Sequence, residues 1–251
     1  MDGGDWRRFA TVLPGSNREG GGMKVIIFGA TGMVGQGALR ECLLDSDVER
    51  VLVVGRSSIG VTHEKLKDIV HKDFFDFSSI EENLSGYDAC FFCLGVSSAG
   101  MKEPEYAHVT YDVTMAAAEA LARKNPGMTF IYVSGAGTDS SERGRSMWAR
   151  VKGRTENALL KMPLKAYMFR PAYIQPMHGI KSKTKLYGAM YAVVAPIYPL
   201  LRRLTPKYVT TTEQLGRAMI CVAKRGAAKR VLESDDINRC CDEEPPERGS
   251  R

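Results

Sequence analysis

The chain has 251 residues, of which 44% are hydrophobic and 25% charged, a balance that excludes wholesale disorder. Its net charge of +6 suits an anionic ligand but is too small to indicate a nucleic-acid-binding protein. No apolar run reaches the roughly 18–20 residues that span a bilayer, and the cysteines do not suggest a disulfide framework. We therefore expect a cytoplasmic α/β protein with reduced thiols.

Strand-like and helix-like segments alternate along the chain. Short apolar runs, typical of strands buried on both faces, lie at 24–28, 50–54, 68–71, 89–94, 128–134, 165–169 and 230–232. Helical spacing predicts helices at 33–44, 104–124, 145–160 and 210–224. In the last helix, Thr210 and Glu213 suggest a capping box. The alternation predicts an α/β fold with a doubly wound, Rossmann-type parallel sheet.

The two ends of the chain lack this pattern. Residues 1–22 show no apolar periodicity and end in three glycines, so we expect a flexible extension, with Met23 as an alternative natural start. Residues 239–251 combine prolines with charges and predict a disordered tail. The folded unit is therefore expected at 23–238, with a small C-terminal substrate cap at about 171–210.

A glycine-rich loop joins the first predicted strand to the first helix. Such a loop allows a tight turn and a close backbone approach to a pyrophosphate, and the helix N-terminus adds free N–H groups. A glycine-rich packing turn is the alternative. The position between strand and helix favours cofactor binding by Gly29, Thr31, Gly32, Met33, Val34 and Gly35.

The residue that follows the second strand bears on the choice of nucleotide. An NAD-preferring site has an acidic residue there to bind the ribose 2′-hydroxyl, whereas this chain has Arg56. A guanidinium matches a 2′-phosphate in charge and geometry. A solvated surface arginine is the alternative, and we expect a preference for NADP(H) over NAD(H).

The order and spacing of several short motifs along the chain carry a family resemblance. The motifs are G-A-T-G-M-V-G, V-V-G-R-S, C-L-G, Y-V-S-G-A-G, V-K-G and F-R-P-A. Over about 23–238 the chain resembles the extended or atypical short-chain dehydrogenases/reductases. Within them it resembles the NAD(P)-binding, epimerase-like group that includes the Tat-interacting oxidoreductase. The resemblance implies further cofactor contacts along the adenine edge, the ribose side and the nicotinamide loop, at Asp73, Phe74, Cys93, Leu94, Gly95, Arg170 and Pro171.

The same resemblance implies a catalytic serine, tyrosine and lysine. Ser134 matches the serine that orients the substrate oxygen, and Lys152 matches the lysine that binds the nicotinamide ribose and lowers the pKa of the tyrosine. Trp148 stands at the tyrosine position, and an indole N–H donates but does not titrate usefully, so it cannot serve as a general acid or base. The alternative for Ser134 is a hydroxyl that caps the local backbone at the end of a strand. The alternative for Lys152 is a solvated lysine on the surface of a helix.

Three accounts of the missing tyrosine stay open. In the first, another group, such as Tyr111, Tyr173 or water, supplies the proton. In the second, the protein binds NADP(H) without turnover. In the third, its chemistry needs no tyrosine at this position. The leading hypothesis is an NADP(H)-dependent oxidoreductase acting on an unknown small molecule, with an apolar substrate as one option. The alternative is a non-catalytic NADP(H)-binding sensor or scaffold.

Two further features have plainer explanations. Cys90 and Cys93 form C-x-x-C within a predicted strand, where they point to opposite faces, so we expect core packing and no metal site. The histidines have no ligand spacing, and His178 is a candidate only because it lies in the expected substrate loop.

A mostly apolar stretch at 186–201 follows the basic residues Lys181, Lys183 and Lys185. We expect this stretch to form part of the substrate cap. A homodimer interface and contact with an anionic membrane surface are the alternatives.

Overall fold

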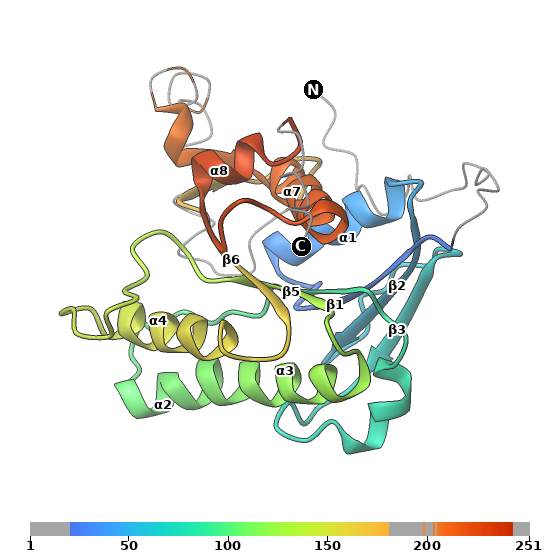
Figure 1. Cartoon of the computed structure of the whole chain (residues 1–251), viewed down its shortest axis with the longest axis horizontal. Helices are drawn as coiled ribbons and strands as arrows, with labels where there is room; N and C mark the ends of the chain where they lie inside the picture. Colours follow the sequence, from blue (N-terminus) through green and yellow to red (C-terminus); the bar gives the residue numbers. More distant parts are fainter. Residues whose placement is uncertain (1–20, 181–197, 199–202, 204, 243–251) are drawn as a thin grey trace, which may run out of the picture.

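Seven parallel strands form the central sheet of the computed structural model, which describes residues 21–180, 198, 203 and 205–242 (Figure 1). The strands are β1 Met23–Phe28, β2 Val48–Gly55, β3 Leu66–Val70, β4 Ala89–Phe92, β5 Thr129–Val133, β6 Lys165–Arg170 and β9 Val231–Glu233. Their spatial order is β3-β2-β1-β4-β5-β6-β9. This order confirms the predicted Rossmann-type, doubly wound sheet.

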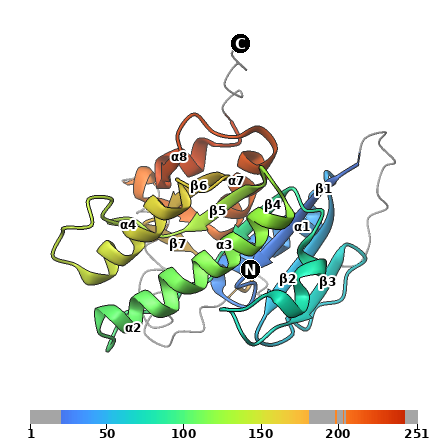
Figure 2. The same cartoon turned by 60° about the horizontal axis from the view of Figure 1, so that its bottom comes forward.

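Helices cover both faces of this sheet. On one face α1 Met33–Leu44 packs against α7 Thr212–Arg225, and on the other lie α2 Glu103–Ala107, α3 Val113–Lys124 and α4 Met147–Leu159 (Figures 1 and 2). A π-helical segment, His108–Asp112, joins α2 to α3, so the helix predicted at 104–124 is continuous but locally widened. Apolar spacing alone does not reveal such a one-residue insertion.

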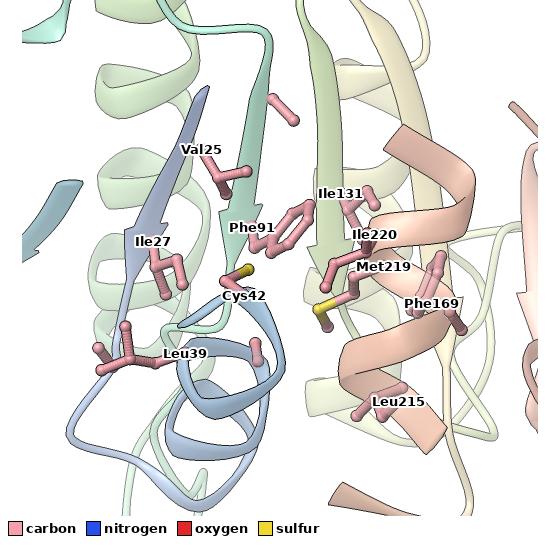
Figure 3. Close-up of a cluster of buried hydrophobic side chains, with 14 of the residues drawn as sticks. Val25, Ile27, Leu39, Cys42, Phe91, Ile131, Phe169, Leu215, Met219 and Ile220 are labelled. Atoms are coloured by element: carbon pink, nitrogen blue, oxygen red, sulfur yellow. The ribbon is translucent and has the colours of Figure 1, made fainter. Parts of the chain in front are cut away.

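The hydrophobic core consists of two layers, one on each face of the sheet. Val25 and Ile27 of β1 point toward α1 and α7, where they meet a cluster that includes Leu39 and Met219 (Figure 3). Ile26 of the same strand belongs to the opposite cluster, beneath α3 and α4. Because successive strand residues point to opposite faces, a strand covered on both sides must be apolar throughout.

Short elements at the C-terminal side were not predicted. Strands β7 Tyr173–Gln175 and β8 Val209–Thr211 form a separate two-stranded parallel sheet, and α8 Ser234–Arg239 follows β9. Elements of three to six residues are too short to show periodicity. The two strands lie at either end of the cap predicted at about 171–210. Outside the described residues lie the apolar stretch 186–201, apart from Tyr198, and the three lysines that precede it.

The capping box predicted at Thr210 and Glu213 is wrong. Thr211 is the N-cap of α7, and its hydroxyl accepts the N–H of Gln214 at 2.9 Å. The reason is the pairing of β8 with β7, which holds Thr210 in an extended strand and delays the helix by one residue. The hydroxyl of Thr210 is buried and has no hydrogen-bond partner among the described residues.

The expectation that all thiols are reduced also differs from the structure. Cys221 of α7 and Cys241, beyond α8, form a disulfide with a Cα–Cα distance of 5.7 Å. The sequence could not reveal this pair, because only the folded chain brings α8 back against α7. Cys90 and Cys93 are free and pack toward opposite core layers, as predicted.

Neither a metal site nor a membrane-spanning helix occurs in the described parts of the chain. No group of three or more metal-ligating side chains forms there. No helix within the same residues is long and apolar enough to cross a bilayer. The cytoplasmic location, the homodimer and the contact with a membrane surface stay predictions.

The reassigned helix cap can be tested with two matched variants. Thr211→Val removes the capping hydroxyl and should lower the free energy of unfolding by about 1 kcal/mol, a fall in Tm of roughly 2–4 °C. Thr210→Val replaces an unpartnered buried hydroxyl and should be neutral or stabilising. Calorimetric unfolding measures both, and an equal or larger loss for Thr210→Val would contradict the assignment.

Candidate active site

The carboxyl ends of the strands meet along one edge of the sheet because all seven strands are parallel. Strands β2 and β3 lie on one side of β1, and β4 and the later strands lie on the other. The order in which successive strands are added therefore changes direction between β1 and β4. Open α/β sheets bind ligands at such a switch point, where the loops on its two sides diverge. The loops after these strands carry most of the predicted site residues.

The glycine loop packs its backbone directly against the loop that follows β4. Gly29 has a φ of +78°, and a Cβ atom there would lie 2.7 Å from the carbonyl carbon of Cys93 and 2.8 Å from the nitrogen of Leu94. A Cβ atom on Gly35 would lie 2.2 Å from the carbonyl oxygen of Gly29. That oxygen accepts the N–H of Gly32 at 2.9 Å and closes the turn. Only glycine fits Gly29 and Gly35 without forcing these segments apart.

The N-terminus of α1 offers its amides to this turn. Its N-cap is Gly32, which has no side chain to accept the first N–H groups of the helix. Uncapped N–H groups and the helix dipole attract anions. Thr31, Met33 and Val34 are half-buried around the turn. The arrangement fits the pyrophosphate of a dinucleotide.

The side chains expected around the nucleotide differ in what they offer. Arg56 is exposed after β2 and has no hydrogen bond or ion pair with any described residue. Asp73 is exposed and accepts a main-chain N–H two residues later at 2.9 Å. Phe74 is buried against Phe28, so its side chain belongs to the core. Gly95 is exposed in the loop after β4.

A buried carboxylate binds both Ser134, which was predicted as catalytic, and Arg170, which was predicted as a cofactor contact. Glu156 of α4 is only 1% exposed, and it accepts the hydroxyl proton of Ser134 at an Oγ–Oε1 distance of 2.5 Å. It also forms an ion pair with Arg170, whose Nε lies 3.0 Å from Oε1. The Ser134 hydroxyl also lies 3.2 Å from the main-chain oxygen of Phe169. Because a serine has one O–H and both acceptors belong to the protein, the hydroxyl is left only as an acceptor toward a ligand.

Arg170 is likewise committed to partners inside the protein. Its guanidinium donates to the Ser140 hydroxyl at 2.6 Å and lies 3.7 Å from Glu233 of β9. Hydrogen bonding to Glu156 raises the pKa of Arg170 and outweighs the effect of burial. Pro171, the next residue, is buried. The charge of Arg170 therefore serves the fold at the end of β6.

Lys152 reaches the same strand end from α4. Its Nζ donates to the main-chain oxygen of Ser134 at 2.5 Å and lies 5.8 Å from the ring centre of Tyr132. Burial lowers the pKa of the Lys152 ammonium to about 8, although the nearby Glu156 carboxylate acts in the opposite direction. The amine is therefore close to its titration midpoint at neutral to slightly basic pH.

Trp148 lies one helical turn before Lys152, half-exposed, with its ring beside Gly137. The two tyrosines considered as substitutes are engaged elsewhere. The guanidinium of Arg154 covers the ring of Tyr111 at 4.2 Å from its centre. Tyr173 donates its hydroxyl proton to Gln175 at 2.8 Å.

Sequence reasoning missed Glu156 and gave His178 no clear role. Glu156 follows Lys152 by four residues and lies on the buried side of α4, and an acid at such a helix position is the signal that was available. His178 is exposed, has a φ of +55°, and its Nε2 lies 2.8 Å from Glu213.

Comparison with known proteins agrees with this geometry. Residues 29–180 match a family model described as NAD(P)H-binding. The chain belongs to this family. It is 27% identical over 141 residues to Leucinostatins biosynthesis cluster protein T of Purpureocillium lilacinum, covering 55% of this chain and 51% of the relative. It is 27% identical over 154 residues to Protein HTATIP2 of Rattus norvegicus, covering 60% and 62%. The chain thus spans about half to three fifths of the length of these relatives.

Solved structures share the fold of this NAD(P)H-binding protein at low sequence identity. The Bordetella bronchiseptica enzyme WbmF in complex with NAD+ aligns with a TM-score of 0.63 at 16% identity, covering 86% of this chain and 76% of WbmF. The UDP-N-acetylglucosamine 4-epimerase of Methanobrevibacter ruminantium aligns with a TM-score of 0.63 at 15% identity, covering 84% and 76%. The predicted resemblance to NAD(P)-binding, epimerase-like proteins is confirmed.

The buried ion pair predicts a large loss of stability on charge removal. Glu156→Gln keeps the shape of the side chain but removes the buried counter-ion of the Arg170 guanidinium, whose side chain is only 12% exposed, and leaves it only the more distant Glu233 at 3.7 Å. We expect a loss of roughly 3–5 kcal/mol, or a fall in Tm of at least about 6 °C.

The matched control is Glu82→Gln, which breaks an ion pair with Lys124 at a glutamate that is 89% exposed. This exchange should cost about 0–1 kcal/mol. Thermal unfolding of both variants measures the difference, and similar losses would contradict a structural role for the Glu156 charge.

Proposed function

We propose that this NAD(P)H-binding protein is an oxidoreductase that interconverts a carbonyl and an alcohol group on a small molecule. The observation that carries the proposal is the amine of Lys152, which lies at the end of β5 with a pKa lowered to about 8. When bound, a reduced nicotinamide would supply a hydride, and the substrate oxygen would then need one proton. A titratable group at this strand end meets that need.

The residues divide into those that bind and those that act on a proton. The glycine turn and the open amides of α1 bind the pyrophosphate. In this proposal the substrate oxygen exchanges its proton near Lys152, whose amine is held at the end of β5. Glu156 and Arg170 keep the ends of β5 and β6 in place around it.

We further propose that NADP(H) is preferred over NAD(H). Arg56 is exposed directly after β2, and no described residue neutralises its charge. The guanidinium is therefore available for the 2′-phosphate that distinguishes the two nucleotides.

Fluorescence titration of both nucleotides tests this preference. Arg56→Ala should weaken NADPH binding roughly 10–100-fold, the value of one charge-assisted pair, and leave NADH binding nearly unchanged. Arg50→Ala is the matched control, since Arg50 is also exposed but lies near the opposite end of β2. Equal affinities of the wild-type protein for NADPH and NADH would contradict the assignment.

A non-catalytic NADP(H)-binding protein is the second candidate, and two observations favour it. Trp148 does not supply the titratable hydroxyl that the fold's chemistry ordinarily uses, and the Ser134 hydroxyl points inward to Glu156. The two candidates differ in whether NADPH is consumed when a carbonyl substrate is present.

Turnover of NADPH over a panel of aldehydes, ketones and quinones separates them. The oxidoreductase proposal expects measurable oxidation by the wild-type protein. Trp148→Tyr should raise it, by up to the roughly 10²–10⁴-fold that an acid–base group contributes. Trp148→Phe also replaces the indole by a six-membered ring but adds no hydroxyl, so it should show no such gain. No wild-type turnover on any member of the panel, with NADPH still bound, would favour the non-catalytic candidate.

A further inference from the structure

The hydroxyl groups near the catalytic end of the sheet have lost their usual part in proton transfer. The Ser134 proton is donated to the buried Glu156 carboxylate at 2.5 Å, and position 148 carries an indole. Tyr132 is fully buried beneath Lys152, and burial raises its pKa far above the ordinary value. Among the described residues at the end of β5, the Glu156 carboxylate is paired with Arg170, and the amine of Lys152 is the remaining group placed to exchange a proton.

We infer that Lys152 Nζ itself gives the proton to the substrate oxygen during carbonyl reduction and takes it back during alcohol oxidation. This inference rests on the proposed oxidoreductase function. It makes Lys152 a direct acid and base, in place of a lysine that only tunes a tyrosine and binds the cofactor ribose.

The surroundings of Lys152 hold the amine at the required place. One N–H is fixed on the main-chain oxygen of Ser134, and a weaker contact of 3.5 Å reaches the oxygen of Val133, so the side chain is anchored at the strand end. An ammonium has three N–H groups. At least one therefore stays available for a substrate oxygen.

The charged and titratable groups around the amine set its acidity. Tyr132 of β5 faces it with its ring, and burial raises the pKa of that phenol, so it stays uncharged at neutral pH. Tyr106 of α2 acts on Tyr132 in the same direction. Glu156 lies one turn away on α4, and Arg170 of β6 neutralises most of its charge. Burial therefore prevails, and the amine exchanges protons at a pH at which an ordinary lysine would not.

The proton balance of the step is simple. The carbonyl carbon receives a hydride, which is two electrons and one hydrogen nucleus, from the reduced nicotinamide dinucleotide as co-reactant. The carbonyl π pair moves to oxygen and takes H⁺ from the Lys152 ammonium. The neutral amine then regains H⁺ from water. Reduction should therefore slow as the pH rises through about 8, and alcohol oxidation should accelerate over the same range.

Lys152→Arg is the decisive variant, because a guanidinium keeps the positive charge and the hydrogen bonds but does not release its proton below about pH 12. We expect NADPH affinity to stay within a few fold of wild type. Turnover should fall by roughly 10²-fold or more, and the pH dependence near 8 should disappear. Lys161→Arg, the same exchange at an exposed residue just beyond α4, is the matched control and should change none of these.

A second readout does not depend on turnover. In NMR spectra of protein labelled with ¹³C and ¹⁵N in its lysines, the Lys152 signal is the one missing from Lys152→Arg. Its titration midpoint should be about 8 in the protein without nucleotide. A midpoint at the ordinary value near 10.5, or a Lys152→Arg variant that keeps its turnover and pH profile, would overturn the inference alone. Absence of turnover in the wild-type protein would instead overturn the oxidoreductase function and this inference with it.

Discussion

The carboxylate of Glu156 is almost fully buried, yet it meets the ends of two neighbouring strands. It accepts the hydroxyl proton of Ser134 after β5 and pairs with Arg170 at the end of β6, and Arg170 extends the contact to Glu233 of β9. A buried charge is tolerated only when ionic hydrogen bonds replace its water. This constraint aligns three strand ends and α4, and it leaves Lys152, one turn before Glu156, over the main-chain oxygen of Ser134.

The two halves of the candidate site depend on different physical effects. The nucleotide half is built from main chain, because Gly29 and Gly35 allow contacts that no side chain would permit. The chemical half depends on charges in a low dielectric, where burial and the nearby carboxylate act on the amine of Lys152 in opposite directions. A change at position 148 is therefore expected to leave the geometry of the nucleotide half unchanged.

Local patterns in the sequence predicted most of the long elements closely. The helix expected at 33–44 has those bounds, and the apolar runs at 24–28 and 165–169 lie within β1 and β6. The cap of α7 was displaced by one residue, because strand pairing between β7 and β8 overrides the local preference of Thr210. The Cys221–Cys241 disulfide was missed because its partners meet only after α8 packs on α7.

By itself, the sequence determined the doubly wound fold, the glycine turn and the presence of Trp148 where a tyrosine was expected. These follow from periodicity, from the conformational freedom of glycine and from residue identity, all of which are local properties. Only the tertiary structure decided that Phe74 belongs to the core, that the Ser134 proton is committed to Glu156, and that Arg170 serves the fold. The physical reason is that a hydrogen-bond donor, a buried charge or an aromatic ring takes its role from neighbours distant in the chain. Glu156 shows this most plainly, since its partners lie 22 and 14 residues away and meet it only when β5, β6 and α4 pack together.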